Sequence, residues 1–556
     1  MFKKYTLVAL LLLGFIAQAS ANSSVKTAIA SAHPLATAAG FEIISQGGNV
    51  FDAAVAVSAT LAVVEPSGSG LGGGGYWLVH RASDNKTRFI DGREKAPLAA
   101  HKDLYVDSAG QVINPRLSLD GAKAAAIPGL PAALVHLAEH YGKLPLARSL
   151  APAIRHARNG FVVGAHHLSL LKNRANVIKQ FPASRDIFLV KGQLPEHFAV
   201  LRQVDLANTL NQLARHGRAG FYANEVADKL LTAVQRAGGI WTTEDLQNYQ
   251  VVEREPVVGN YRGIKITSAP PSSAGGIVLL EALTILSAYD LAKLDKLTQI
   301  HLITEAMRRA YHDRALYLGD SDFVSIPVQH LLSNDYAAGL RSSIRMDAVL
   351  PSKQLSGDVL PDSEGGHTTH FSIIDAEGNR VAATLSINFP FGSGFVASGT
   401  GVLLNDEMDD FVSHAGPNGY GLVGSAANMI APGKRMLSSM TPTFLEDDKR
   451  IAVLGTPGGS RIISMVLLAT LEFAKATSPM SWVKLPRFHH QYLPDVLEYE
   501  NTAFTQQEVV ALKGLGHSLQ ATANPYGNMH AAVLYKDTHT LNAASDPRGE
   551  GFATVK

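Results

Sequence analysis

The first part of the chain alternates apolar segments of helical length with clusters of glycine. Residues 36–64 are rich in alanine with apolar residues at helical spacing, and residues 47–49 interrupt them. This pattern predicts two helices, the second with Asp52 in its first turn, because glycine ends helices and acidic residues favour their N-terminal turn. The glycine-rich residues 68–75 then lead into residues 76–80, which predict a buried strand.

The last third of the chain has the pattern of β-hairpins, in which two apolar runs are joined by a short polar turn. Three such pairs lie at residues 368–375 and 380–387, at 442–445 and 451–454, and at 530–535 with the strand beyond. Gly458 and Gly459 open a helix near Ser460. Earlier, residues 261–268 predict a strand and residues 298–314 a long amphipathic helix. A helix-rich first two thirds therefore precedes a β-rich last third, without a 20–50-residue repeat.

Residues 346–367 differ from both parts because they show no periodicity. Proline and glycine recur among polar residues in this segment. The composition predicts an exposed loop, the kind of place at which a chain is cut.

The first 21 residues have the three parts of an export signal. Lys3 and Lys4 precede an apolar run at residues 5–17, and residues 19–21 supply the small side chains of a cleavage site. The run is shorter than the ~20 apolar residues that span a bilayer, so we expect cleavage rather than an uncleaved anchor. The mature chain would begin at Asn22 in the periplasm, or be secreted.

The charges of the chain nearly cancel, with 49 Lys and Arg against 48 Asp and Glu. Such a balance provides no basic field for a phosphate backbone, so we do not expect nucleic acid as a partner. With 46% hydrophobic residues the chain can bury a large core. The absence of cysteine excludes disulfides, a thiol nucleophile and cysteine-bound metals.

Common catalytic motifs are missing from the sequence. It contains neither GxSxG nor HExxH, which disfavours α/β-hydrolases and zincins. Gly68, Gly70 and Gly73 match GxGxxG, but a predicted helix precedes them and a strand follows, the reverse of a nucleotide-binding motif. We interpret them as a close backbone approach at a tight turn. The histidines show no metal-ligand spacing, and we expect neither a metal nor a cofactor.

A hydroxyl nucleophile remains possible at Thr368, where the predicted loop enters a strand. If the bond between His367 and Thr368 were cut, Thr368 would gain a free α-amine. The pKa of an α-amine is about 7.7–8.0, so it can accept the hydroxyl proton at neutral pH. The alternative is that Thr368 and Thr369 are ordinary strand residues.

Seven motifs, in order along the chain, resemble those of the bacterial γ-glutamyltranspeptidases, which are N-terminal-nucleophile hydrolases. They are GGNVFDAAV (47–55), LGGGG (71–75), DGREKAP (91–97), TTHFS (368–372), NDEMDDF (405–411), LSSM (437–440) and PGGS (457–460). The resemblance extends from about residue 26 to the end of the chain.

The resemblance implies an α+β fold, a four-layer αββα sandwich, and a precursor that cuts itself between His367 and Thr368. Its products would be a helix-rich large subunit, residues 22–367, and a small subunit, residues 368–556. Both subunits would share one fold as a heterodimer.

The resemblance also assigns roles to individual residues. Thr368 would be the nucleophile, and the backbone of Gly458 and Gly459 the oxyanion hole. The remaining matches surround an α-amino acid: Arg93, Ser438 and Ser439 at its carboxylate, Asn388, Glu407 and Asp410 at its ammonium group, and Tyr420 in a lid at residues 413–434.

Two positions depart from the family pattern. Ser386 replaces the usual threonine 18 residues after the nucleophile, so a hydroxyl is retained without the β-branch that limits its rotamers. Glu407 replaces the glutamine of some bacterial members, which makes the ammonium end more negative.

Each of the site residues also has an alternative interpretation from its sequence surroundings. Arg93 could pair with Asp91 or Glu94 at a surface. The acidic residues 407 and 410 could form a solvated face, and the serines 438 and 439 could cap a turn or helix.

The resemblance predicts a γ-glutamyltransferase and glutathione hydrolase. Its substrates would be glutathione and other γ-glutamyl compounds, and the acyl group would pass through a threonine ester to water, an amino acid or a peptide. The alternatives are a glutaryl- or cephalosporin-type acylase on the same fold and an inactive periplasmic binding protein.

Overall fold

Two antiparallel sheets form the centre of the molecule in the computed structural model, which describes residues 25–355, 368–412 and 422–556. The seven-stranded sheet has the order β20-β1-β9-β10-β2-β3-β6 and the six-stranded sheet the order β19-β18-β14-β13-β8-β7. The first comprises β1 (Thr27–Ser31), β2 (Gly74–Arg81), β3 (Lys86–Gly92), β6 (Val252–Arg254), β9 (Thr368–Asp375), β10 (Arg380–Ser386) and β20 (Phe552–Val555). The second comprises β7 (Val257–Tyr261), β8 (Ile264–Ser268), β13 (Thr443–Glu446), β14 (Arg450–Gly455), β18 (His530–Tyr535) and β19 (Thr540–Ser545).

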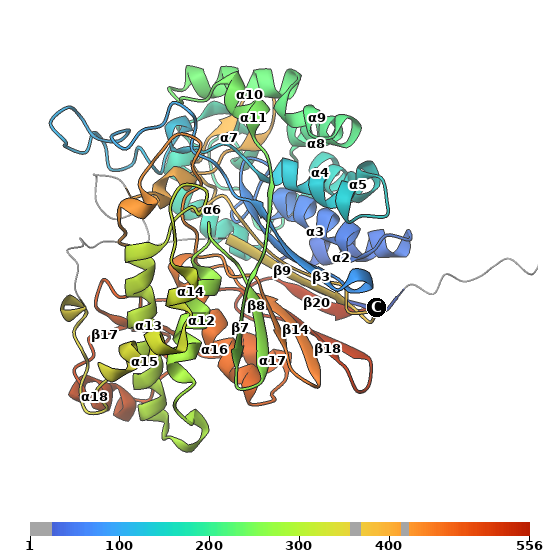
Figure 1. Ribbon diagram of the computed structural model, residues 1–556. Coiled ribbons are helices and arrows are strands. Elements are labelled where there is room, and N and C mark those ends of the chain that lie inside the picture. The colour runs from blue at the N-terminus through green and yellow to red at the C-terminus, as the bar shows by residue number, and fades with distance from the viewer. Residues whose placement is uncertain (1–24, 356–367, 413–421) are drawn as a thin grey trace, which may run out of the picture.

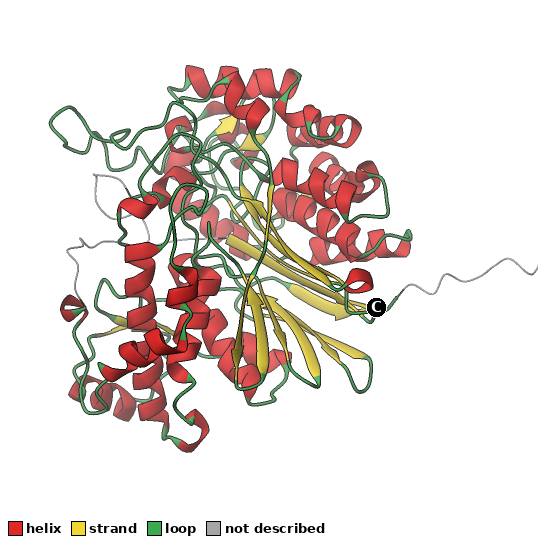
Figure 2. Cartoon of the chain, viewed as in Figure 1, coloured by secondary structure: helices red, strands yellow, loops and turns green. Residues whose placement is uncertain are grey.

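Helices cover the outer face of each sheet, so the predicted four-layer αββα arrangement is confirmed (Figures 1 and 2). The seven-stranded sheet is covered by a layer that includes α2 (Pro34–Ser45), α3 (Val50–Val64), α4 (Leu130–His140) and α5 (Leu146–Asn159). The six-stranded sheet is covered by a layer that includes α12 (Gly275–Leu286), α13 (Lys296–Tyr317), α16 (Ile462–Ala474) and α17 (Pro479–Lys484).

The remaining elements surround these four layers. The helices are α6 (Ala165–Ile178), α7 (Pro182–Phe188), α8 (Val204–His216), α9 (Ala219–Tyr222), α10 (Glu225–Arg236), α11 (Thr243–Asn248), α14 (Val328–Leu331), α15 (Asn334–Ser342) and α18 (Gln506–Gly514). The short strands are β4 (Phe161–Val162), β5 (Val200–Leu201), β11 (Val396–Ala397), β12 (Val402–Leu403), β15 (Phe488–His489), β16 (Leu497–Tyr499) and β17 (Leu519–Ala521).

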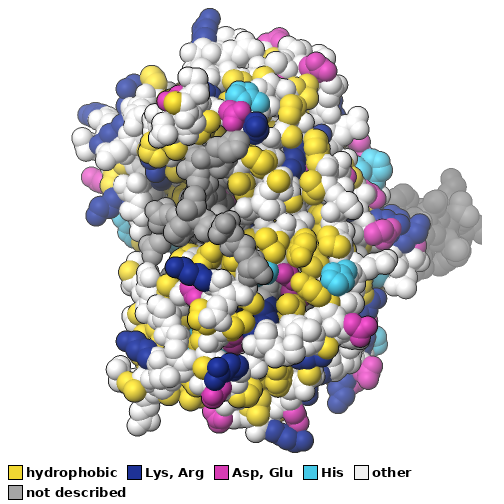
Figure 3. Space-filling view, turned by 60° about the vertical axis from the view of Figure 1, so that its left-hand side comes forward, with side chains coloured by type: hydrophobic (Ala, Val, Ile, Leu, Met, Phe, Trp, Pro, Cys, Tyr) yellow, Lys and Arg dark blue, Asp and Glu magenta, His cyan; other side chains and the backbone are white. Residues whose placement is uncertain are grey.

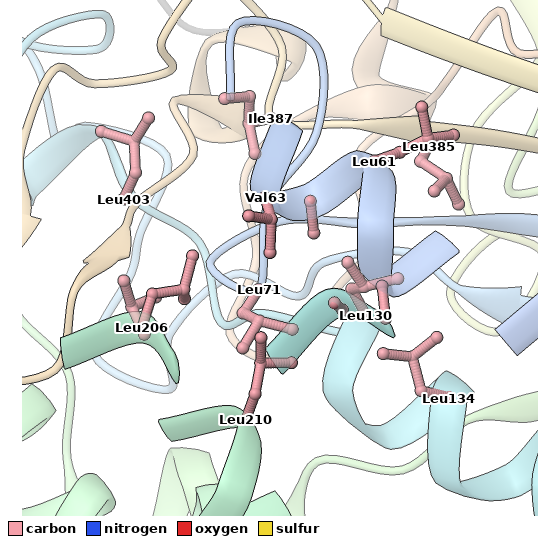
Figure 4. Packing of buried hydrophobic residues seen from close by; sticks show 14 of the residues in the cluster. Leu61, Val63, Leu71, Leu130, Leu134, Leu206, Leu210, Leu385, Ile387 and Leu403 are labelled. Carbon is pink, nitrogen blue, oxygen red and sulfur yellow. The ribbon is translucent and has the colours of Figure 1, made fainter. Parts of the chain in front are cut away.

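The central strands are apolar on both faces because each face contacts a different hydrophobic core. In β10, Val381, Ala383 and Leu385 join the core beneath α3, whereas Ala382 joins the core between the sheets. This alternation follows from the two-residue period of a strand. Figure 4 shows part of the first core, where side chains of α3, α4 and α8 lie near Leu385 of β10 and Ile387, which follows this strand.

The helix pair α2–α3 confirms the prediction for residues 36–64. Asn49 caps α3 by accepting hydrogen bonds from the backbone N–H groups of Phe51 and Asp52. Asp52 in turn accepts the N–H of Asn49 at 2.9 Å, which completes a capping box. Asn49 and Asp52 therefore determine locally where α3 begins.

The glycine-rich segment before β2 is a close backbone approach, as predicted. A Cβ atom on Gly72 would lie 2.1 Å from the carbonyl oxygen of Leu403, and one on Gly73 would lie 2.2 Å from that of Ser386. Any larger residue would push these segments apart. The segment thus brings the end of β10 and β12 close to the start of β2.

Two predictions about local structure are only partly confirmed. The strand expected at residues 261–268 is interrupted by a hairpin turn, because Arg262 and Gly263 both have positive φ values, of 51° and 83°. Of the loop expected at 346–367, residues 356–367 lie outside the described residues, and residues 346–355 are exposed or half-buried except for one. The exception is Ser352, which is buried and whose hydroxyl accepts a hydrogen bond from Arg308 at 2.5 Å.

Acidic and basic side chains are interspersed on the face shown in Figure 3, with hydrophobic side chains between them. This face therefore presents no large field of one sign. Among the described residues, no helix is both long and apolar enough to cross a bilayer.

Candidate active site

Thr368 lies at the start of β9, between β1 and β10 in the middle of the seven-stranded sheet. Its side chain is buried, and its Oγ1 accepts a hydrogen bond from the backbone N–H of Gly458 at 3.3 Å. Gly458 belongs to the loop between β14 and α16 of the other sheet layer. The two segments that the sequence singled out for nucleophile and oxyanion hole therefore meet.

The glycines of this loop have conformations that other residues rarely adopt. Gly458 has φ = 142° and Gly459 has φ = 57°. Gly459 begins a short 3-10 turn, Gly459–Arg461, that leads directly into α16. The N–H of Gly458 can point at Thr368 because the backbone turns sharply at this place.

Ser386 lies directly opposite Thr368 in the register of β9 and β10. Its hydroxyl accepts the N–H of Asn388 at 2.8 Å. Asn388 has φ = 70°, a conformation that asparagine tolerates better than most residues. The serine thus holds the backbone at Asn388, two residues after it, in addition to lying opposite Thr368.

Arg93 is buried beside two carboxylates that lie more than 300 residues away along the chain. Its Nη1 is 2.6 Å from Glu407 Oε2, and its Nη2 is 2.5 Å from Asp410 Oδ2. Glu94 lies farther from it, at 3.6 Å. The surface alternative is therefore wrong for Arg93, and the buried Glu407 does not belong to a solvated acidic face.

The charges in this cluster change the pKa values of its members. Burial lowers the pKa of Arg93, but Glu407, Asp410 and Glu94 raise it by more, so it stays well above its usual value and the guanidinium is charged. Burial raises the pKa of Glu407, and Arg93 opposes this increase. The neighbouring acids therefore keep a guanidinium charged in a site removed from water.

Ser438 and Ser439 lie shortly before β13, and Ser438 pairs with Ser273 of the segment between β8 and α12. The N–H of Ser438 donates to the carbonyl oxygen of Ser272 at 3.0 Å, and its Oγ accepts the N–H of Met440 at 3.0 Å. The turn-cap interpretation thus also holds for Ser438. The hydroxyl of Ser439 accepts a hydrogen bond from Arg314 at 3.2 Å.

One cavity brings most of these residues together. The predicted site residues that line it are Arg93, Thr368, Ser386, Asn388, Asp410, Ser438, Ser439 and Gly459. Glu407 and Gly458 support the cavity through their contacts with Arg93 and Thr368. Tyr420 and His367 lie outside the described residues, as does the predicted signal at residues 1–21.

Two residues near the site were missed by sequence reasoning. Arg314 lines the cavity from α13, but an arginine near a helix C-terminus is explained equally well by the helix dipole. Glu65 follows α3, and its Oε2 accepts the hydroxyl of Thr369 at 2.5 Å. No local pattern connects Glu65 with a strand 300 residues later.

Among the described residues, no group of three or more histidine, aspartate or glutamate side chains is arranged to hold a metal ion. The described lining of the cavity offers hydroxyl groups, backbone N–H groups and the charges of Arg93, Arg314 and Asp410.

The αββα layers and a threonine at the start of a central strand define an N-terminal-nucleophile hydrolase fold. The family model for γ-glutamyltranspeptidase matches residues 36–555. The glutathione hydrolase proenzymes of Pseudomonas sp. (strain A14) and Escherichia coli (strain K12) are 41% and 39% identical to the chain. Each alignment covers 94% of this chain, and 92% and 90% of the two relatives.

A cephalosporin acylase from Bacillus halodurans has a similar structure, with a TM-score of 0.83 and 28% sequence identity. The similarity covers 96% of each chain. The match to the family model and the identity to these relatives show that the chain belongs to the γ-glutamyltranspeptidase family.

Proposed function

We propose that the chain is a proenzyme that cuts itself between His367 and Thr368 and then acts as a γ-glutamyltransferase and glutathione hydrolase. The observation that carries this proposal is the single cavity that contains the Thr368 hydroxyl, basic Arg93 and acidic Asp410. A γ-glutamyl group ends in an α-ammonium and an α-carboxylate, so groups of both signs suit it.

The reaction would proceed through an ester of Thr368. The new α-amine of Thr368 accepts the proton of its hydroxyl, and Oγ1 attacks the γ-carbonyl carbon. The N–H of Gly458 stabilises the oxyanion, the amine leaves with a proton, and a γ-glutamyl ester remains. Water then releases glutamate, or an amino acid or peptide takes the acyl group as a new amide.

Arg93, Ser438 and Ser439 would hold the α-carboxylate, and Asn388, Glu407 and Asp410 the α-ammonium. The large subunit, 22–367, and the small subunit, 368–556, would stay together as a heterodimer. The predicted signal at residues 1–21 supports a periplasmic location.

A chromogenic anilide assay tests the proposal. Purified protein should release the aniline from a γ-glutamyl anilide, faster when a dipeptide acceptor is added. The glutaryl anilide, which lacks the α-ammonium, should be a very poor substrate because it offers no positive group to Asn388, Glu407 and Asp410 and so loses the interactions proposed for that end.

Comparable kcat/KM for the two anilides would favour the acylase alternative, which the fold of the cephalosporin acylase also suits. An uncut chain without activity toward either anilide would favour a binding protein.

A further inference from the structure

The first two residues of β9 point to opposite faces of the seven-stranded sheet, because successive side chains of a strand alternate. Thr368 lines the cavity of the candidate active site. Thr369 is buried on the face that α3 covers, and its hydroxyl donates to Glu65 Oε2 at 2.5 Å. Glu65 thus holds the residue after the nucleophile from the face opposite the proposed substrate.

Glu65 directly follows α3, and the turn after it lies against the nucleophile. The backbone N–H groups of Gly68 and Ser69 donate to the carbonyl oxygen of Glu65 at 3.0 and 3.2 Å. A Cβ atom on Gly68 would lie 3.1 Å from the carbonyl oxygen of Thr368 and 3.5 Å from Cδ of Glu65. Gly68 therefore allows this turn to approach the backbone of Thr368 itself.

Glu65 also lines a second cavity, which no step of the proposed reaction uses. The titratable groups that line it with Glu65 are His33, His166, His167 and Glu550. Burial lowers the pKa of His33 and of His167 to about 4, so both imidazoles are neutral near pH 7. Within this cavity, the described surroundings of Glu65 include neither lysine nor arginine.

A half-buried carboxyl group without a cation beside it is costly, because no positive charge replaces its lost hydration. The one described hydrogen bond of the Glu65 carboxyl is the one from Thr369. Acidic groups kept in such surroundings are typical of functional sites. The contact with Thr369 therefore indicates a role in holding the start of β9.

We propose that Glu65 is a positioning residue: by accepting the Thr369 hydroxyl it fixes the start of β9 and aligns the nucleophile. This inference rests on the proposed function and adds a residue to it. The N–H of Gly458 lies 3.3 Å from Thr368 Oγ1, longer than most N–H···O hydrogen bonds, so a small shift of the strand would break this contact. Self-cleavage and turnover would both slow, since both use this hydroxyl.

The experiment is a double-mutant cycle with the γ-glutamyl anilide and fully cleaved enzyme. Glu65→Leu and Thr369→Val each remove one side of the hydrogen bond and keep the size of the side chain. Each should lower kcat by about 10- to 100-fold and change KM by less than about threefold, because a misplaced nucleophile affects the reaction more than binding. The double variant should be no slower than the slower single variant, because both changes remove the same contact.

Conservative variants provide a second readout. Glu65→Gln keeps an acceptor and Thr369→Ser keeps the donor, so both should retain kcat within about threefold of wild type. Glu446→Gln is the matched control: Glu446 is also half-buried, but Lys536 donates to it at 2.8 Å and it lines neither cavity. It should leave kcat unchanged.

Circular dichroism reports whether each variant folds. If Glu65→Leu does not fold, the comparison of Thr369→Val with Thr369→Ser decides. Where a variant matures too slowly for steady-state kinetics, the half-time of self-cleavage replaces kcat.

Losses of kcat that multiply in the double variant would overturn the inference while the proposed function stands. Wild-type kcat in a folded Thr369→Val enzyme, or a loss that appears only in KM, would overturn it as well. A wild-type protein that does not release the aniline would overturn the proposed function, and this inference with it.

Discussion

The side chain of Thr368 is buried and contacts a loop of the other sheet layer. Its hydroxyl is held by the N–H of Gly458, and its strand lies between two others, so the side chain has little freedom. A nucleophile gains from such positioning, because a fixed attack geometry removes much of the entropic cost of the reaction. The proposed free amine would add the base without a second residue.

The proposed double use of Thr368 predicts the behaviour of two variants. Thr368→Ala should remain a single chain and be inactive, because the same hydroxyl is needed for self-cleavage and for turnover. Thr368→Ser should do both slowly, since it keeps the hydroxyl but loses the methyl group that limits its rotamers. Gel electrophoresis and N-terminal sequencing of the small fragment check this result. A new N-terminus other than Thr368, or an active Thr368→Ala enzyme, would contradict the assignment.

Glu65 holds the residue next to the nucleophile, and its protonation should affect stability. Burial raises its pKa from 4.5 to about 7, although the hydrogen bond from Thr369 opposes the shift and Glu550 adds to it. Between pH 4.5 and 7 the folded protein thus retains a proton that the unfolded chain releases. The contribution of Glu65 to the free energy of unfolding is full below about pH 4.5 and is lost as the pH rises to about 7.

Glu65→Gln should therefore reduce the difference in melting temperature between pH 5 and pH 8, because glutamine cannot release a proton. Thermal melts of wild type and variant at the two pH values measure it. Glu139→Gln, at an exposed position of α4, is the control and should melt with the wild-type difference. A Glu65→Gln protein with that same difference would show that Glu65 is already ionised at pH 5.

At the scale of elements, the loop between β14 and α16 decides where the proposed oxyanion hole lies. A Cβ atom on Gly458 would lie 2.6 Å from Cε of Met465, and its φ of 142° disfavours any side chain. The flexible Met465 side chain can move away from such a Cβ atom, but a non-glycine residue at position 458 would still have a strained backbone. This short loop therefore connects the helix layer to the nucleophile.

Gly458→Ala should lower kcat of the anilide reaction by about 10- to 100-fold, because a small displacement of the N–H weakens oxyanion stabilisation. Gly514→Ala is the matched control: Gly514 ends α18 with no atom within 4 Å of its would-be Cβ. Steady-state kinetics on fully cleaved enzyme separate catalysis from maturation. Normal kcat in Gly458→Ala would place the oxyanion hole elsewhere.

At the scale of the whole molecule, each of the two large sheets contains strands from both sides of the proposed cleavage point. In the seven-stranded sheet, β9 and β10 lie between β1 and β2, and β20 pairs with β1 at the edge. In the six-stranded sheet, β13 pairs with β8. Separating the two fragments would break strand pairs in both sheets and expose both hydrophobic cores.

The two fragments of the cut protein should therefore stay together in size-exclusion chromatography and unfold in one transition. Residues 368–556 produced alone should not fold, because β9 and β10 would lack both neighbouring strands and the α3 layer. Chromatography, calorimetry and circular dichroism test these expectations. A separately folded small fragment with cooperative melting would contradict them.

The sequence by itself determined the features that depend on neighbouring residues. The α2–α3 pair with its cap at Asn49, the β9–β10 hairpin and the glycines before β2 follow from periodicity and turn chemistry. The family motifs also predicted the layers and most of the residues that line the cavity. The turn at Arg262–Gly263 is not predicted because only its second residue is a glycine, and an arginine rarely adopts the positive φ that the first one has.

Only the tertiary structure decided which distant groups touch. Arg93 and Asp410 are 317 positions apart, and their ion pair exists because the loop after β12 returns to the end of β3. The contacts of Arg314 with Ser439 and of Glu65 with Thr369 likewise join separate layers. Periodicity reports which face of an element is buried, but the partner of a buried charge is set by how the layers pack.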